Sequence, residues 1–211
     1  MGNNLSDKLS ELYEGLGIYV RFYVWARIRL LKSGYYSEFL PHDGLLIDVG
    51  CGRGVMANYL SFRFPDSQVI GIDLDHKRID VALKTVGERG NITFLLRDAR
   101  NWALPSCTGV IMTNFLHHVS RQDQELVLGS VFQSLEKGGV LLISEVDPTA
   151  RPLYRYWVSY LSDRILYPSA RSCFRKPCDW ESILGRVGFT VKATKLWGPI
   201  LGGILYVCQK R

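Results

Sequence analysis

The chain has 211 residues, of which 47% are hydrophobic, and it carries five cysteines and a formal net charge of +6. This length and apolar content suffice for one sizeable core. The sequence shows neither an apolar run long enough to cross a bilayer nor a cleavable leader. We therefore expect a soluble, cytoplasmic protein, and the scattered cysteines predict neither disulfides nor a metal site.

The first predicted element is an amphipathic helix within residues 5–36. The stretch IYVRFYVWARIRLLK places Arg21, Arg29 and Lys32 on one side of a helical wheel. We expect residues 1–44 to form a helical cap ahead of the first strand. The positive charge lies elsewhere, because residues 151–211 have a net charge of +8.

Short apolar runs alternate with segments of helical length in the rest of the chain. Runs without polar alternation indicate strands that are buried on both faces. The predicted strands are LLIDV (45–49), QVIGID (68–73), ITFLL (92–96), GVIMTN (109–114), VLLISEV (140–146), FTVKAT (189–194) and ILYVCQK (204–210). The predicted helices are Val55–Phe62, His76–Arg89, Gln122–Leu135 and Cys178–Val187, with Gly138-Gly139 as the stop of the third. This order predicts a doubly wound α/β core.

Three glycines directly follow the first strand and lead into a helix. Gly50, Gly52 and Gly54 allow positive φ and let a ligand approach the backbone. A dinucleotide-binding turn also has three glycines, but its third glycine comes three residues after the second. Here the interval is two residues, and Asp48 stands before the first glycine, so the pattern disfavours a dinucleotide.

Acidic residues follow the next two strands. Asp73 ends the second strand, where a carboxylate accepts the hydroxyls of a ribose; an N-cap for the following helix is the less favoured alternative. Asp98 and Ala99 follow the third strand and offer a carboxylate beside a backbone N–H, which suits adenine. An ordinary turn at the end of the strand explains Asp98 and Ala99 equally well.

The motifs DVGCGRG, VIGIDLD, RDA, GVIMTNFLHHV and LEKGGVLLISE, in this order, resemble those of class I S-adenosylmethionine-dependent methyltransferases. They cover residues 45–146. The resemblance implies a Rossmann-like, seven-stranded sheet that is mostly parallel, with an antiparallel last strand and helices on both faces. It also implies S-adenosyl-L-methionine as the cofactor and S-adenosyl-L-homocysteine as the product. The most similar branch has an LHH signature and contains quinone, sterol and other small-molecule or lipid methyltransferases.

The resemblance further implies which residues bind the cofactor. The loop from Asp48 to Gly54 would hold the methionyl part, Asp73 the ribose, and Asp98 with Ala99 the adenine, while Asn114 and Phe115 would border the sulfonium. The full predicted set is Asp48, Gly50, Cys51, Gly52, Gly54, Asp73, Leu74, Asp98, Ala99, Asn114 and Phe115.

A catalytic base is optional in such an enzyme. A sulfonium is an activated methyl donor, so alignment of the acceptor and exclusion of water are the main requirements. The candidates for a base are His117, His118 and Glu145, with Asp147 close by, all at carboxyl ends of strands. For each histidine a structural packing role is favoured. For Glu145, a role as a catalytic base and a role in supporting the cofactor end of the site are about equally favoured.

Residues 148–176 lie outside the alternation of strands and helices and are rich in Tyr and Arg. They lie at the sheet edge where ligands bind in open α/β sheets. Together with the N-terminal helix, this insert suits an apolar pocket with a membrane-facing rim. Taken singly, Tyr154, Trp157 and Leu161 are slightly better explained as a helical stripe packed on the sheet.

We predict one methyltransferase domain over residues 1–211. Its parts are the cap, a cofactor-binding core (45–147), a substrate-side insert (148–176), and a C-terminal helix with the last two strands (177–211). The expected acceptor is a hydrophobic or aromatic small molecule, such as a lipid, a quinone or a polyketide-like metabolite. The alternatives are an RNA or protein methyltransferase and an S-adenosylmethionine-binding protein without turnover. A small-molecule partner is favoured over nucleic acid, and peripheral membrane contact stays open.

Overall fold

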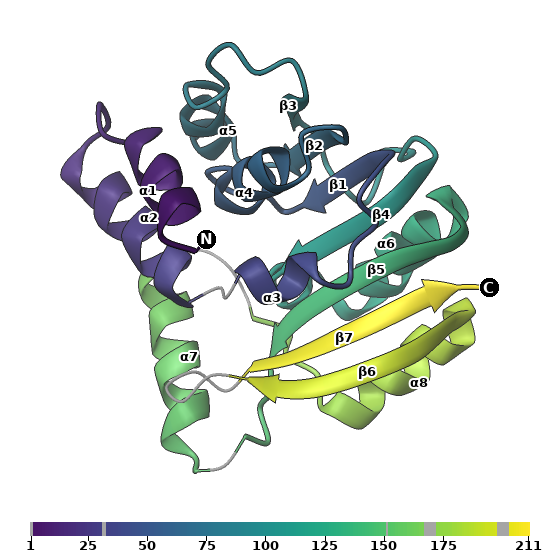
Figure 1. The fold of residues 1–211 in the computed structure, drawn as a ribbon. Coiled ribbons are helices and arrows are strands. Elements are labelled where there is room, and N and C mark those ends of the chain that lie inside the picture. Colours follow the sequence, from purple (N-terminus) through teal and green to yellow (C-terminus); the bar gives the residue numbers. More distant parts are fainter. Residues whose placement is uncertain (1, 31–32, 151, 167–171, 198–202) are drawn as a thin grey trace. The chain divides into compact units, whose positions relative to one another are not determined.

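A computed structural model describes residues 2–30, 33–150, 152–166, 172–197 and 203–211 (Figure 1). These residues form a seven-stranded sheet in the order β3-β2-β1-β4-β5-β7-β6. The strands are β1 (Leu45–Val49), β2 (Gln68–Asp73), β3 (Ile92–Leu96), β4 (Cys107–Thr113), β5 (Leu135–Val146), β6 (Phe189–Trp197) and β7 (Gly203–Lys210). The helices are α1 (Gly2–Glu11), α2 (Ile18–Leu30), α3 (Ser33–Ser37), α4 (Val55–Arg63), α5 (His76–Leu83), α6 (Arg121–Ser134), α7 (Tyr154–Leu166) and α8 (Pro177–Val187), with a 3-10 turn, η1 (Leu116–His118).

The pairing of the strands follows the predicted pattern. β2 pairs in parallel with both β1 and β3. β7 lies between β5 and β6 and pairs antiparallel with both (Figure 1). The predicted Rossmann-like fold, a mostly parallel seven-stranded sheet with an antiparallel last strand and flanking helices, is therefore confirmed.

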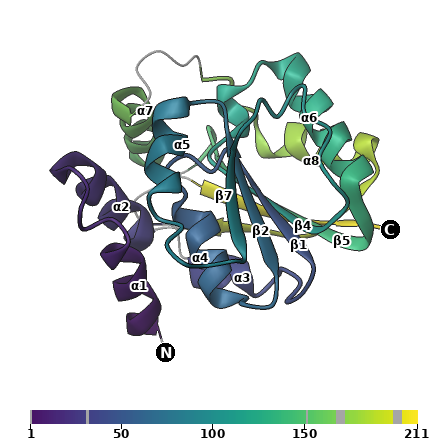
Figure 2. The same cartoon turned by 90° about the horizontal axis from the view of Figure 1, so that it is seen from above.

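The chain divides into two compact units. Unit 1 comprises residues 1–102 and 107–109, and unit 2 comprises residues 103–106 and 110–211. In unit 1, α4 packs against all three parallel strands, α5 packs against β2 and β3, and α1, α2 and α3 contact α4 (Figure 2). Because α4 has neighbours on several sides, its residues from Val55 to Ser61 are all buried.

The N-terminal segment differs from the single amphipathic helix predicted for residues 5–36. It forms three helices, and Gly15 and Gly17 lie between α1 and α2, which is consistent with the poor helix propensity of glycine. Arg21 and Arg29 are exposed as expected, but the same exposed face of α2 also carries large apolar side chains. Lys32 lies outside the described residues.

Helix α5 ends at Leu83, six residues before the predicted end at Arg89. The hydroxyl of Thr85 donates a hydrogen bond of 2.6 Å to the carbonyl of Ala82, so a side chain takes a partner that a continuing helix would use. Gly87 then adopts φ +58°, which is incompatible with a right-handed helix.

In unit 2, α6 packs against β5, and α8 packs against β6 and α6. The prediction that Gly138-Gly139 ends α6 is wrong. The helix ends at Ser134, Leu135 caps it with an extended backbone, and Gly138 lies within β5 with φ +81°. None of the described helices is both long and apolar enough to cross a membrane.

Candidate functional site

The glycine loop connects β1 to α4 in unit 1. Gly50, Gly52 and Gly54 have φ values of +76°, +55° and +83°. A side chain at Gly54 would collide with the core, because its Cβ would lie 2.6 Å from Cζ of Phe94. The N–H of Gly50 donates to the carbonyl of Ile72 at 2.8 Å, which ties the loop to the end of β2. Glycine is thus needed here for both backbone conformation and close packing.

Asp73 bridges the glycine loop and the turn after β2. Its Oδ2 accepts the N–H of Gly52 at 2.8 Å, and its Oδ1 accepts the N–H of Asp75 at 2.9 Å. Asp75, rather than Asp73, caps α5 by accepting from Lys77 and Arg78, so the capping alternative for Asp73 is wrong. Each oxygen of Asp73 keeps further acceptor capacity for a ligand hydroxyl.

Asp48 is a buried carboxyl group directly before the loop. Its Oδ2 accepts the N–H of Ala57 at 3.1 Å, whereas its Oδ1 has no hydrogen-bond partner among the described residues. Burial raises the pKa of Asp48 to about 7; the charge of Arg27 and the Ala57 hydrogen bond oppose this shift, and the charge of Asp73 adds to it. A buried acceptor without a partner is unfavourable unless a ligand supplies a donor. The loop therefore fits a ligand that carries a cationic or N–H group.

Cys51 lies inside the same loop. Its side chain is buried, and this burial raises the pKa of the thiol well above its ordinary value, with the charges of Asp48 and Asp73 adding to the effect. The thiol thus stays protonated at neutral pH and offers the loop an apolar surface.

The N-terminal helices hold the loop through aromatic residues that the sequence analysis missed. The hydroxyl of Tyr13 donates to the carbonyl of Arg53 at 2.9 Å. The guanidinium of Arg53 lies 4.4 Å from the ring centre of Tyr23 and 5.4 Å from that of Tyr19, both on α2. The spacing of Tyr19 and Tyr23, four residues apart, is the one sequence signal that places two aromatic rings on one helix face.

Asp98 follows β3 next to Asp73, because the N–H of Arg97 donates to the carbonyl of Asp73 at 3.1 Å. Arg100, which the sequence analysis also missed, binds both oxygens of Asp98, with Nε 2.9 Å from Oδ1 and Nη2 2.6 Å from Oδ2. These bonds lower the pKa of Asp98 below its ordinary value. Asp98 is therefore ionised, and Ala99 beside it is buried.

Glu145 organises the turn after β4 in unit 2. Its Oε1 accepts the N–H groups of Phe115 and Leu116 at 3.2 and 2.8 Å, and its Oε2 lies 2.5 Å from Nδ1 of His117. Glu145 and His117 are each only 1% exposed. Asn114, which precedes this turn, has φ +51°, a conformation that asparagine tolerates better than most residues.

The two histidines are part of an aromatic stack. The His117 ring stacks on Phe174 with 4.9 Å between ring centres, and it lies 4.2 Å from the His118 ring. These ring contacts agree with the packing role that the sequence favoured for His117. Asp147, in the same unit, accepts the N–H and the hydroxyl of Thr149 at 2.8 and 2.6 Å.

Helix α7 joins this stack with one face and exposes the other. Tyr156 and Tyr160 lie 6.0 and 6.4 Å from the Phe174 ring. The exposed face carries Tyr154, Trp157, Val158 and Leu161, and Leu153, just before the helix, is exposed as well. The expectation that Tyr154, Trp157 and Leu161 pack on the sheet is wrong, because each is more than half exposed. Tyr167 and Arg171, also in the predicted insert, lie outside the described residues.

The structure thus gathers the predicted site residues in two groups. In unit 1, Asp48, the glycine loop, Asp73, Leu74, Asp98 and Ala99 lie at or shortly after the carboxyl ends of β1, β2 and β3. In unit 2, Phe115 and His117 form hydrogen bonds with Glu145 around the turn after β4, and the N–H of Asn114 donates to the carbonyl of the adjacent Ser144. No cluster of His, Cys, Asp and Glu in the described part of the chain could hold a metal ion.

This strand order, with a glycine loop after β1 and an acid at the end of β2, defines a Rossmann-like cofactor-binding protein. Residues 46–139 match the family model described as a methyltransferase domain. Residues 46–139 are therefore similar to a methyltransferase domain, and this likeness supports the class I S-adenosylmethionine-dependent family that the motifs predicted.

The individual proteins that the chain matches include methyltransferases. The chain is 32% identical over 111 residues to trans-aconitate 2-methyltransferase from Methylobacterium radiotolerans, a match that covers 53% of this chain and 41% of that protein. It is 25% identical over 168 residues to ubiquinone/menaquinone biosynthesis C-methyltransferase from Syntrophotalea carbinolica, covering 76% of this chain and 69% of that protein. The chain spans about half or less of the length of the first curated relatives that it matches.

Solved structures share the fold over a longer stretch. Magnesium protoporphyrin IX methyltransferase from Synechocystis PCC 6803 with bound SAH superimposes with a TM-score of 0.70 at 18% identity. The superposition covers 97% of this chain and 94% of that one. At this level of identity, the likeness establishes the fold alone.

Proposed function

We propose that this protein is an S-adenosylmethionine-dependent methyltransferase that acts on a hydrophobic or aromatic small molecule. The observation that carries the proposal is the glycine loop itself, in which Asp73 binds the N–H of Gly52 while Asp48 keeps one buried oxygen without a partner. Such a loop suits a ligand with ribose hydroxyls and an ammonium group. The family match and the names of the relatives, which include small-molecule methyltransferases, support the same conclusion.

The cofactor supplies an activated methyl group, and the residues of this chain bind and orient it. The loop from Asp48 to Gly54 would hold the methionyl part, and Asp73 the ribose hydroxyls. Asp98 and Ala99 would contact the adenine, and Leu74, which is 62% exposed, offers an apolar surface beside Asp73. Asn114 and Phe115 remain assigned to the neighbourhood of the sulfonium.

We assign Glu145 a positioning role. Its two oxygens already bind two backbone N–H groups and the His117 ring, and it is almost fully buried. A carboxylate engaged in this way fixes the backbone of the turn that carries Phe115. Neither Glu145 nor its partner His117 then needs to act as a base that removes a proton from the acceptor.

An apolar acceptor is supported by the exposed face of α7. Trp157 and Leu161 on this helix are each 54% exposed. Large apolar side chains at such positions favour contact with an apolar ligand. The face belongs to the segment that the sequence places on the substrate side.

The alternative acceptor, RNA, would need a continuous basic surface in residues 151–211. Several described basic side chains of this region are used within unit 2 instead. Arg186 lies 3.2 Å from Glu125, Arg175 binds the carbonyl of Arg121, and Lys210 binds the carbonyl of Leu135. Glu125 offsets the charge of Arg186, and the two carbonyl contacts engage hydrogen-bond donors of Arg175 and Lys210 that a phosphate backbone would otherwise use.

Calorimetry with S-adenosylhomocysteine tests the cofactor assignment. We expect the wild-type chain to bind it, and Asp73→Ala to weaken binding by about tenfold or more, because ribose hydrogen bonds and the loop contact are lost together. Asp73→Asn, which keeps one acceptor oxygen, should lose less. Asp66→Ala, which removes an exposed acid from the same unit, is the matched control. If the wild type does not bind, or if Asp73→Ala binds as the wild type does, the assignment fails.

Label transfer tests the acceptor class. The protein is incubated with cell extract and methyl-labelled S-adenosylmethionine, and the label is counted in organic-soluble, RNA and protein fractions. We expect it in the organic phase. Trp157→Ser should raise KM for that acceptor without changing S-adenosylhomocysteine binding, whereas Leu126→Ser, on the exposed side of α6, should not. Label in RNA or protein would support those acceptors, and cofactor binding without transfer would identify a binding protein.

A further inference from the structure

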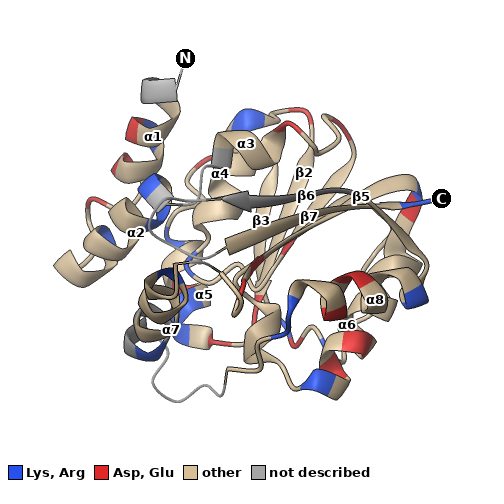
Figure 3. Cartoon of the chain, turned by 90° about the horizontal axis from the view of Figure 1, so that it is seen from below, with Lys and Arg blue, Asp and Glu red and all other residues tan. Residues whose placement is uncertain are grey.

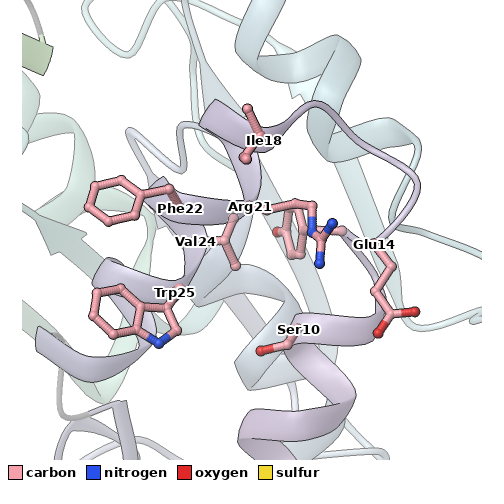
Figure 4. Close-up of a pocket in the computed structure, with 8 residues that line it drawn as sticks. Ser10, Glu14, Ile18, Arg21, Phe22, Val24 and Trp25 are labelled. Carbon is pink, nitrogen blue, oxygen red and sulfur yellow. The ribbon is translucent and has the colours of Figure 1, made fainter.

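Helix α2 exposes a face of large apolar side chains. Ile18, Phe22 and Trp25 are 86%, 65% and 50% exposed. Their spacing of three to four residues places them on one side of the helix. Figure 4 shows Phe22 and Trp25 projecting side by side, and their rings stack with 5.8 Å between centres. The helix buries Tyr23 and Val24 instead, so this face is left over after α2 has packed.

Arginines lie within the same arc of the helix. Arg21 and Arg29 are both exposed, and the guanidinium of Arg29 lies 5.0 Å from the ring centre of Trp25. The sequence of α2 contains no Asp or Glu, and Figure 3 shows basic positions along it. The exposed face is therefore both apolar and cationic.

A hollow of about 370 Å³ adjoins this face between α1 and α2 (Figure 4). Ile18, Phe22 and Trp25 contribute to its lining, together with Val24 and Arg21. Glu14 also lines it and is the acidic group that faces Arg21 from the neighbouring segment. Glu14 offsets Arg21 at the hollow, and Arg29, which does not line the hollow, leaves the exposed face of α2 with a positive charge.

We propose that α2 docks on the surface of an anionic phospholipid bilayer. Phe22, Trp25 and Ile18 would enter the boundary between head groups and acyl chains, and Arg21 with Arg29 would contact lipid phosphates. Aromatic side chains favour the head-group boundary of a bilayer, and each arginine close to an anionic leaflet adds about 1 kcal/mol of attraction, or about fivefold in binding. A second copy of the chain fits less well, because a twofold contact through this face would bring like charges together.

Docking through α2 would bring the bilayer close to the glycine loop, because α2 contacts that loop. Tyr19 and Tyr23 of this helix hold Arg53 in the glycine loop, so a bilayer at α2 lies close to the loop. An acceptor that partitions into lipid would then be concentrated near the proposed cofactor site. This last consequence rests on the proposed function, whereas the docking itself does not require the cofactor.

Vesicle flotation tests the docking with the full chain and no cofactor. We expect binding to phosphatidylcholine vesicles that contain phosphatidylserine, and much weaker binding to pure phosphatidylcholine or at high salt. The Arg21→Gln/Arg29→Gln variant should bind about fivefold more weakly for each arginine removed. Lys84→Gln/Lys137→Gln removes the same charge from exposed positions outside α2 and should bind as the wild type does. Equal losses in both variants, or no binding to either kind of vesicle, would overturn the proposal.

Fluorescence quenching by lipids with brominated acyl chains identifies the inserted residue. We expect Trp25→Phe to lose most of the quenching and Trp157→Phe, on the exposed face of α7, to keep it. Phe22→Ser/Trp25→Ser should abolish vesicle binding while circular dichroism stays unchanged, since both residues are exposed. The proposal fails if Trp157→Phe alone removes the quenching. It also fails if the Phe22/Trp25 variant only converts a dimer into a monomer in sedimentation.

Discussion

Asp48 is a carboxyl group at a position where a folded core usually holds an apolar side chain. It is fully buried, and only one of its oxygens has a hydrogen bond among the described residues. The cost of charging it in this environment is what raises its pKa to about 7. The unfolded chain has no such cost, so its Asp48 would titrate near pH 4.

This difference predicts a pH dependence of stability. Between about pH 4 and pH 7 the folded chain keeps a proton on Asp48 that the unfolded chain has released, so the free energy of unfolding should fall as pH rises. Asp48→Asn cannot ionise, and we expect it to be more stable than the wild type at pH 8 by roughly 2 to 4 kcal/mol. The gain should shrink towards pH 5, as measured by urea unfolding at each pH. A gain that is constant with pH would contradict the assignment.

The role of Glu145 can be tested by substitution, because a residue that positions the turn and a residue that acts as a base respond differently to the same change. Glu145→Ala leaves two N–H groups and the His117 ring without their partner and should lower the free energy of unfolding by about 3 kcal/mol. Glu145→Gln keeps an acceptor oxygen for the two N–H groups, so we expect it to fold and to retain part of kcat. A Glu145→Gln variant that folds and binds S-adenosylhomocysteine but has no methyl transfer would show that the carboxylate acts as a base.

At the scale of elements, the sequence predicts best where one local rule decides. β1, β2 and β3 have the predicted bounds because each is an apolar run that ends at turn residues. The end of α5 is mispredicted because the Thr85 side chain competes for a backbone carbonyl, an event that periodicity does not record. Likewise, the aromatic residues of α2 and α7 satisfy a core pattern although the structure exposes several of them.

The same division applies to the site. Asp73 and the glycines follow from spacing along one short stretch of chain. The contact of Tyr13 with Arg53, forty residues away, depends on how α1 packs, and no pattern in either segment contains it. The bond of Arg100 to Asp98 is local, yet it depends on a side-chain conformation rather than on a motif.

Gly54→Ala tests the packing of the loop against its own unit. The substitution imposes φ +83° on alanine and places a methyl group 2.6 Å from Phe94, so we expect a loss of stability of about 2 kcal/mol or more. Gly87→Ala imposes a similar φ of +58° with nothing within 4 Å and should cost about 1 kcal/mol. Equal losses in urea unfolding would show that backbone strain alone accounts for the effect.

For the whole molecule, the N-terminal helices do more than pack against α4. Through Tyr13 they support the loop backbone, and through the rings of Tyr19 and Tyr23 they hold the side chain of Arg53. With Ile18 and Phe22 they also offer an apolar surface to the outside. The segment that the family model does not include therefore connects the proposed cofactor loop to the proposed lipid surface.

The burial of Cys51 has a chemical consequence for this loop. Thiol reagents attack the thiolate, and Cys51 is both shielded and protonated, so alkylation should occur only when the loop opens. Cys178 is exposed and should be modified first, while Cys51 and Cys208 should react slowly in peptide mass spectra. S-adenosylhomocysteine should slow Cys51 further and leave Cys208 unchanged. Equal alkylation rates for Cys51 and Cys178 would contradict this expectation. If Cys51 reacts slowly as expected, its alkylation rate measures how often the proposed cofactor loop opens.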